Sequence, residues 1–124
     1  MSPIALVVDD SMLVRHTVCR FLEERGYEVH TATNGAEAMQ MLGCVRPDLI
    51  VTDLQMPRMT GGEFITALKS SPATASIPVI VIAGRNHVSD PRSEPRADYV
   101  IFKDIDAETQ LQKALAKIFA TAAR

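Results

Sequence analysis

Four charged residues could together bind a cation and a phosphoryl group, because each follows a short apolar run of the sequence. They are Asp9 and Asp10 after residues 4–8, Asp53 after residues 49–52, and Lys103 after residues 99–102. Three carboxylates in one place repel one another unless a hard divalent cation or an ammonium group lies among them. Mg2+ is the expected cation, because it takes one or two carboxylates together with waters and phosphate oxygens. These residue types predict phosphoryl chemistry if the fold brings them together.

Asp53 is the best candidate for the nucleophile. A carboxylate can attack phosphorus to give an acyl phosphate, while a metal ion and a lysine offset charge on the transferring oxygens. Asp9 and Asp10 are adjacent and better suited to holding the metal. Each residue alone has an ordinary explanation, as an acidic helix start, a turn before Pro57 or a solvated lysine. Their conjunction at three strand ends favours a phosphoacceptor site.

Hydrophobic patterning predicts the elements that position these residues. Unbroken runs rich in Val and Ile are typical of strands buried on both faces. Five strands are predicted, at residues 4–8, 27–32, 49–52, 79–82 and 99–102. Helices are predicted from Ser11 to Gly26, after an N-cap at Asn34, over residues 61–70, and over a last amphipathic segment that carries Leu111, Leu115 and Ile118. Strand–helix alternation implies a parallel sheet, whose carboxyl strand ends share one ligand-binding edge.

Residues 84–98 interrupt this alternation. They include Pro91 and Pro95 and many charged residues, but Val88 is their single large apolar residue. No amphipathic helix fits such a pattern. We expect the fourth helix of the alternation to be missing or reduced to a loop.

Length and composition are typical of one globular domain, here predicted over residues 1–124. Hydrophobic residues make up 47% and charged residues 23% of the chain. A net charge of −2 without a block of like charge argues against direct binding to nucleic acid or to a membrane. The N-terminus resembles neither a signal peptide nor a membrane span, which predicts a cytoplasmic protein. Cys19 and Cys44 lack metal-ligand spacing and are predicted to be buried small residues in a reducing compartment.

The sequence resembles the receiver domain of two-component response regulators over essentially its whole length. The matching motifs are Val7-Val8-Asp9-Asp10-Ser11, Asp53-Leu-Gln-Met-Pro57-Arg-Met-Thr-Gly61, Pro78-Val-Ile-Val-Ile82 and Lys103. The resemblance implies a flavodoxin-like, doubly wound α/β fold with a five-stranded parallel sheet of order 2-1-3-4-5.

The same resemblance implies roles for the site residues. Asp53 would accept a phosphoryl group from a histidine kinase or histidine phosphotransfer protein, and its phosphorylation would change binding to a downstream protein. Asp10 would bind Mg2+ directly, Asp9 through water, and Gln55 through its backbone carbonyl, while Lys103 would contact the phosphoryl oxygens. Such a domain is a signalling switch rather than an enzyme, and at most catalyses its own phosphorylation and dephosphorylation. The resemblance implies no particular pathway, cognate kinase or oligomeric state.

Three positions depart from the family pattern. Ala83 stands where Thr or Ser usually bonds a phosphoryl oxygen, which leaves the backbone N–H of Gly84 and the side chain of Arg85 as candidate donors. Val100 stands at the position of a switching Tyr or Phe. Asp104 replaces a proline that follows a cis peptide, and a cis bond without proline costs about 2.5–4 kcal/mol. These changes predict an altered output surface.

Two other functions stay open at this point. A degenerate receiver would bind a partner without being phosphorylated, as the three departures suggest. A Mg2+-dependent aspartyl-phosphate hydrolase of the haloacid dehalogenase type would carry a second Asp two residues after the nucleophile. That position is Gln55, which disfavours the hydrolase.

Overall fold

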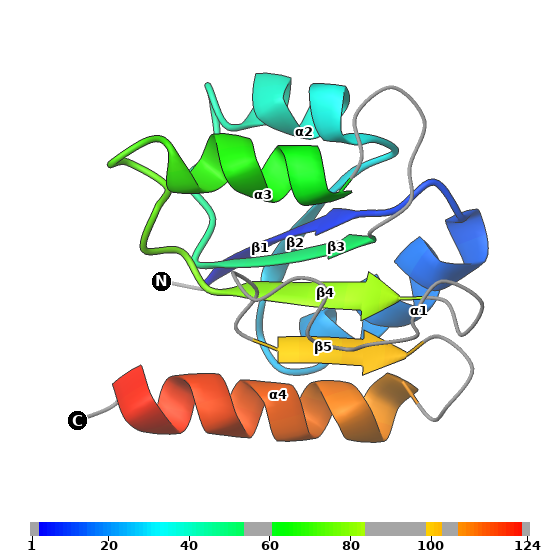
Figure 1. Ribbon diagram of the computed structural model, residues 1–124. Coiled ribbons are helices and arrows are strands. Elements are labelled where there is room, and N and C mark those ends of the chain that lie inside the picture. The colour runs from blue at the N-terminus through cyan, green and yellow to red at the C-terminus, as the bar shows by residue number, and fades with distance from the viewer. Residues whose placement is uncertain (1–2, 54–60, 84–98, 103–106, 123–124) are drawn as a thin grey trace.

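The computed structural model describes residues 3–53, 61–83, 99–102 and 107–122. Within these ranges, strands and helices alternate as far as the fourth strand, after which the next described element is the fifth strand (Figure 1). The strands are β1 (Ile4–Val8), β2 (Glu28–Ala32), β3 (Leu49–Asp53), β4 (Val79–Ala83) and β5 (Tyr99–Phe102). The helices are α1 (Met12–Glu23), α2 (Gly35–Met41), α3 (Gly61–Lys69) and α4 (Ala107–Ala122). Each predicted strand and helix is therefore present, with bounds that differ by a few residues at most of the ends.

The five strands form one parallel sheet in the order β2-β1-β3-β4-β5, which confirms the predicted topology. The strand order reverses between β1 and β3, and ligands of such sheets bind at this reversal, beyond the carboxyl ends of the strands. The register is continuous across the sheet. Val8 pairs with Thr52, Thr52 with Val81, and Val81 with Val100.

Helices cover both faces of the sheet, α2 and α3 on one face and α1 and α4 on the other (Figure 1). Two buried clusters fill the spaces between the layers. Successive β1 residues alternate between them, because side chains along a strand point to opposite faces. Ala5 and Val7 pack with α1 and α4, whereas Leu6 and Val8 pack with α2 and α3. All five β3 residues are buried, which explains why the strand begins with the unbroken apolar run Leu49-Ile-Val51.

Local sequence signals fix where the first two helices begin and where α1 ends. The side chain of Ser11 accepts a hydrogen bond from the N–H of Val14, and that of Asn34 accepts one from Glu37, as N-cap residues do. Gly26 follows α1 with a φ of 90°. That left-handed conformation suits glycine, which has no Cβ to clash.

The prediction that both cysteines are buried was wrong for Cys44. Cys44 is exposed and Cys19 is half-buried, and both thiols are free. Cys44 follows α2 in a turn, where a small residue has no core to pack against.

Several predicted features lie outside the described residues. They are the loop at 84–98 and the site residues Gln55, Gly84, Arg85, Lys103 and Asp104. The backbones of Ala83 and Val100 lie in β4 and β5, but their side chains are outside the description. Among the described helices, none has the length and apolar character needed to cross a lipid bilayer.

Candidate functional site

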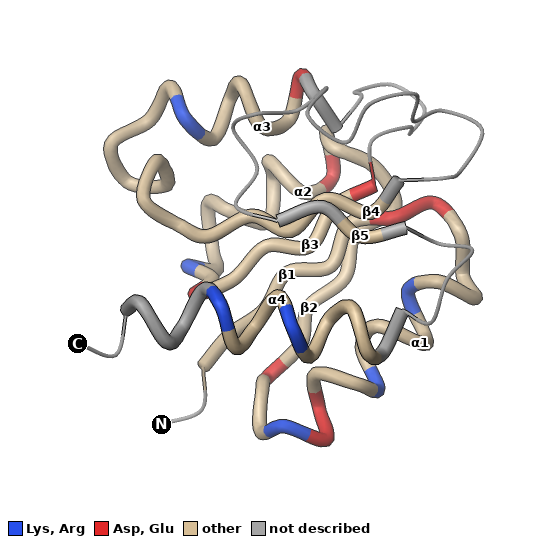
Figure 2. The backbone as a smooth tube through the Cα atoms, turned by 60° about the horizontal axis from the view of Figure 1, so that its bottom comes forward, with Lys and Arg blue, Asp and Glu red and all other residues tan. Residues whose placement is uncertain are grey.

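Three carboxylates meet at the edge where β1 and β3 end. Asp9, Asp10 and Asp53 each offer a carboxylate oxygen, and these oxygens lie within 4.8 Å of one another. Acidic positions gather at this edge, where the chain leaves the sheet and enters α1 (Figure 2). Asp9 is fully buried and Asp53 is 3% exposed, whereas Asp10 is exposed. The site therefore has two desolvated carboxylates and one that solvent reaches.

Asp9 is held in place through all three of its polar groups. Its N–H donates to the carbonyl of Ala32 at 3.1 Å, which extends the pairing of β1 with β2 by one residue. Its Oδ1 accepts a hydrogen bond from the N–H of Ser11 at 2.8 Å. Its carbonyl accepts one from Nη1 of Arg15 at 2.7 Å. The turn between β1 and α1 is thus fixed on both sides of the carboxylate pair.

Asp53 is the last residue of β3 and pairs with Ile82 in β4. The hydroxyl of the preceding Thr52 is buried and donates to the Asp53 carbonyl at 3.1 Å. A strand position flanked by paired strands leaves the backbone little freedom. The side chain at residue 53 is consequently presented from a rigid element.

The donor set fits a hard divalent cation. Carboxylate oxygens are the ligands that Mg2+ prefers, and it retains waters beside one or two of them. The exposed Asp10 gives such an ion a route from solvent. Buried like charges at this spacing also raise the energy of the cation-free protein, so a cation would relieve repulsion as well as bind.

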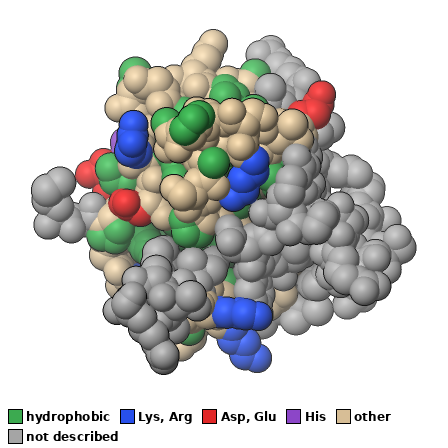
Figure 3. All heavy atoms as spheres, turned by 60° about the vertical axis from the view of Figure 1, so that its left-hand side comes forward, with side chains coloured by type: hydrophobic (Ala, Val, Ile, Leu, Met, Phe, Trp, Pro, Cys, Tyr) green, Lys and Arg blue, Asp and Glu red, His purple; other side chains and the backbone are tan. Residues whose placement is uncertain are grey.

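The opposite end of the molecule differs in charge. Figure 3 shows this face, where the described surface carries separate acidic and basic side chains among hydrophobic ones.

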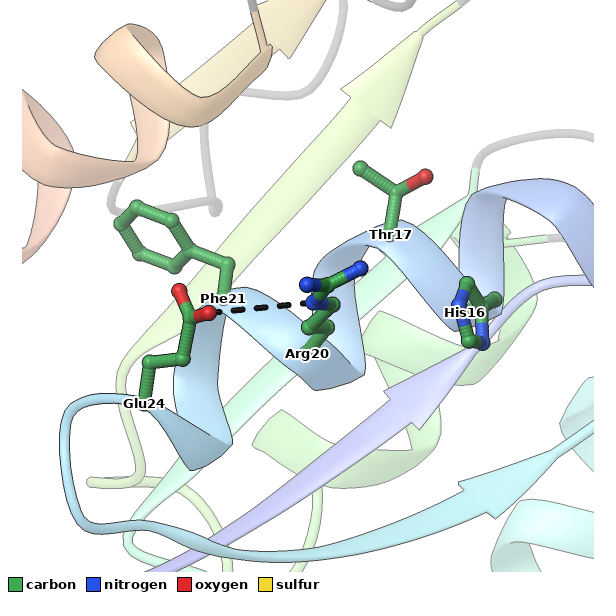
Figure 4. A pocket seen from close by; sticks show the side chains of 5 residues that line it. All are labelled: His16, Thr17, Arg20, Phe21 and Glu24. Atoms are coloured by element: carbon green, nitrogen blue, oxygen red, sulfur yellow. Dashed lines mark ion pairs between the residues drawn. The ribbon is translucent and has the colours of Figure 1, made fainter.

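A pocket of about 400 Å³ lies along α1, and sequence reasoning did not predict it. Its lining residues are His16, Thr17, Arg20, Phe21 and Glu24 (Figure 4). None of the three clustered carboxylates lines it, so it is separate from the candidate site.

Sequence reasoning did not predict one contact of the site, that of Arg15. Its guanidinium contacts the backbone of the acidic turn. No spacing rule signals this contact, because it depends on the path of a long side chain. The roles predicted for Asp9, Asp10 and Asp53 stay predictions, although the structure places the three side chains together.

Comparison with known proteins identifies the family. Residues 5–116 match the model of the response regulator receiver domain. The response regulator MprA of Mycobacterium ulcerans is 40% identical over 90 residues, which are 73% of this chain and 38% of that protein. The chain thus spans well under half the length of this curated relative. It belongs to the response regulator receiver domain family.

Solved structures agree with this assignment. The receiver domain of a signal transduction histidine kinase from Syntrophus aciditrophicus gives a TM-score of 0.84 at 33% identity, over 99% of this chain and 94% of that one. The receiver domain of the sensor histidine kinase PA1611 from Pseudomonas aeruginosa gives a TM-score of 0.82, over 94% of this chain and 97% of that one. That structure contains a magnesium ion in its active-site cleft, but at 18% identity the likeness shows the fold alone.

Proposed function

We propose that this domain is a phosphoacceptor switch that takes a phosphoryl group onto Asp53 with Mg2+ bound beside it. One observation carries the proposal: carboxylates from the ends of β1 and β3 lie within 4.8 Å of one another at the point where strand order reverses. Two of the three are buried. Such a cluster raises the energy of the folded chain unless it binds something positive.

The proposed roles follow the placement of each group. Asp10 and Asp53 would ligate the ion directly, and Asp9 through water, with the carbonyl of Gln55 as a further ligand. The bound ion would supply positive charge for the oxygens of the transferring group. Lys103 follows β5 directly in the sequence and is proposed to contact the same oxygens.

A phosphohistidine of a histidine kinase or histidine phosphotransfer protein is the proposed donor. An Asp53 carboxylate oxygen forms a bond to phosphorus while the bond from phosphorus to the imidazole nitrogen breaks. The electron pair of that bond leaves with the nitrogen, which is then protonated. The nucleophile is nearly buried, so the donor must approach along the edge at which Asp10 is exposed.

Incubation with Mg2+ and a small phosphodonor such as acetyl phosphate tests the proposal. Intact-mass measurement should show a gain of one phosphoryl group, which disappears in Asp53→Asn and without Mg2+. Asp48→Asn is a matched control, because Asp48 lies outside the cluster and its Oδ2 accepts a hydrogen bond from the N–H of Ile4 at 2.8 Å. The control should gain the phosphoryl group as the wild type does.

The departures at Ala83 and Val100 favour one other function, a receiver-like module that binds a partner without phosphorylation. The same experiment separates the two. If the folded wild-type protein gains no mass at any Mg2+ concentration, the phosphoacceptor proposal fails and the binding module replaces it.

A further inference from the structure

Helix α1 carries a cation close to its N-terminus. The N-terminus of a helix favours negative charge, which Asp9 and Asp10 supply just before the N-cap Ser11, and it disfavours positive charge. Arg15 is the fourth helical residue and is half-buried there. Where a sequence breaks a local rule of this kind, a functional reason is the usual explanation.

The side chain of Arg15 bends back toward the start of its helix. Helical side chains tilt toward the N-terminus, which brings a long side chain at this position alongside the preceding turn. Nη1 donates to the carbonyl of Asp9 at 2.7 Å, across six residues of sequence. A hydrogen bond from a charged donor is shorter and stronger than a neutral one.

This contact differs from two other hydrogen bonds of Asp9. The bonds to Ala32 and from Ser11 join backbone groups of those neighbours to Asp9, so they persist whichever side chains the neighbours carry. The bond from Arg15 comes from a side chain, so a substitution can remove it. It fixes the peptide between Asp9 and Asp10, and hence the direction in which the second carboxylate leaves the chain.

We infer that Arg15 is a positioning residue for the acidic turn. By holding the Asp9 carbonyl it aligns the carboxylates of Asp9 and Asp10 with that of Asp53 and raises the affinity of the site for a divalent cation. The inference rests on the proposed function only in taking the cation to bind among these three groups. It goes beyond that proposal by assigning a role to a residue that does not itself bind the ion.

A purely electrostatic role would have the opposite sign. A guanidinium near three carboxylates competes with a cation, so its removal would strengthen Mg2+ binding if charge alone mattered. If positioning dominates, its removal weakens binding. The direction of the change therefore decides between the two.

Isothermal titration calorimetry with Mg2+ makes the comparison. Arg15→Met keeps an unbranched, helix-compatible side chain and removes the donor and the charge. We expect its dissociation constant to rise about tenfold, at the lower end of the roughly 10- to 100-fold loss caused by removing groups that orient metal ligands. Arg15→Lys keeps the charge but is shorter and lacks the planar fork, so it should restore part of the affinity.

Arg20→Met is the matched control. It makes the same substitution in the same helix and changes the net charge equally. Arg20 pairs with Glu24 at 3.7 Å on the exposed surface, away from the acidic turn (Figure 4). Exposed pairs of this kind contribute little to stability, and we expect the control to bind Mg2+ as the wild type does. An affinity for Arg15→Met that is equal to or higher than that of the wild type would overturn the inference.

A second measurement needs no metal and stays decisive if the wild type does not bind Mg2+. The N–H of Ser11 donates to Oδ1 of Asp9, so a looser turn should expose it. Amide hydrogen exchange followed by NMR in EDTA should be several-fold faster at Ser11 in Arg15→Met than in the wild type. Val81 lies in the middle of β4 and should keep its rate. Equal exchange at Ser11 in the two proteins would refute the positioning role, whatever the metal titration shows.

Discussion

Replacing Asp53 by Asn should stabilise the metal-free protein. The three carboxylate oxygens lie within 4.8 Å of one another, so the substitution removes two repulsive pairs. At that distance each pair costs about 3.5 kcal/mol for an effective dielectric constant of about 20, and about 0.9 kcal/mol in bulk water. Asp10 is exposed, which places its pair with Asp53 nearer the lower value. An amide also accepts hydrogen bonds less strongly than a carboxylate, and we expect a net gain of about 1–3 kcal/mol.

Urea unfolding in EDTA measures this difference. For a domain of this size the slope is about 1–3 kcal/mol per molar urea, so the midpoint of Asp53→Asn should lie roughly 1 M higher. Mg2+ should reduce the difference between the two urea midpoints or reverse its sign, because the wild type binds the ion. A ligand at 100 times its dissociation constant stabilises the folded state by about 2.7 kcal/mol. The reasoning is refuted if the variant unfolds at the same or lower urea concentration in EDTA. Asp48→Asn should behave oppositely and lose stability, since Asp48 accepts a hydrogen bond from Ile4.

Three further predictions concern stability and reactivity away from the cluster. Asn34→Ala removes the N-cap of α2, whose side chain accepts a hydrogen bond at 2.8 Å, and should lower the free energy of unfolding by about 1 kcal/mol in a thermal or urea melt. Iodoacetamide at pH 8 should alkylate the exposed Cys44 before Cys19, because burial raises the pKa of the Cys19 thiol, and peptide mapping would show the order. The pKa of Tyr27 is raised by burial and then by Asp48. Unfolding therefore releases a proton above pH 10, stability falls as pH rises through that range, and urea melts of Tyr27→Phe should show a smaller fall.

The sheet could be predicted from sequence because its strands are buried on both faces. Such strands leave unbroken runs of Val and Ile, and the runs at 4–8 and 79–82 coincide with β1 and β4 to within one residue. The meeting of the carboxylates was also predictable. Parallel strands end at one edge, so any polar residues that follow them gather there.

Other features depend on geometry that patterning does not encode. Whether Cys44 is buried depends on where the chain runs after α2, and a single residue in a turn has no period from which to judge. The contact between Arg15 and the Asp9 carbonyl depends on a rotamer that sequence alone does not specify. Both concern side chains near the ends of helices, where neither the helical nor the strand period applies.

The register bears on how such a switch could report phosphorylation. Val100 pairs with Val81, which in turn pairs with Thr52, the residue before Asp53. This row of backbone pairs leaves Tyr99 one position earlier, opposite Ile80. Val100, and not Tyr99, therefore stands in the row of backbone pairs that leads to Thr52.

The electrostatic repulsion within the acidic cluster helps to distinguish the two candidate functions. In a domain that only bound a partner, the repulsion among three carboxylates within 4.8 Å of one another, two of them buried, would have no function. A domain that binds Mg2+ and a phosphoryl group needs that repulsion, because its relief contributes to the binding of the cation. Arg15 bears on the same question, because its guanidinium binds the Asp9 carbonyl in the acidic turn. If Asp53→Asn is more stable than the wild type in EDTA and Arg15→Met binds Mg2+ more weakly, both results favour the cation-binding domain over the partner-binding module.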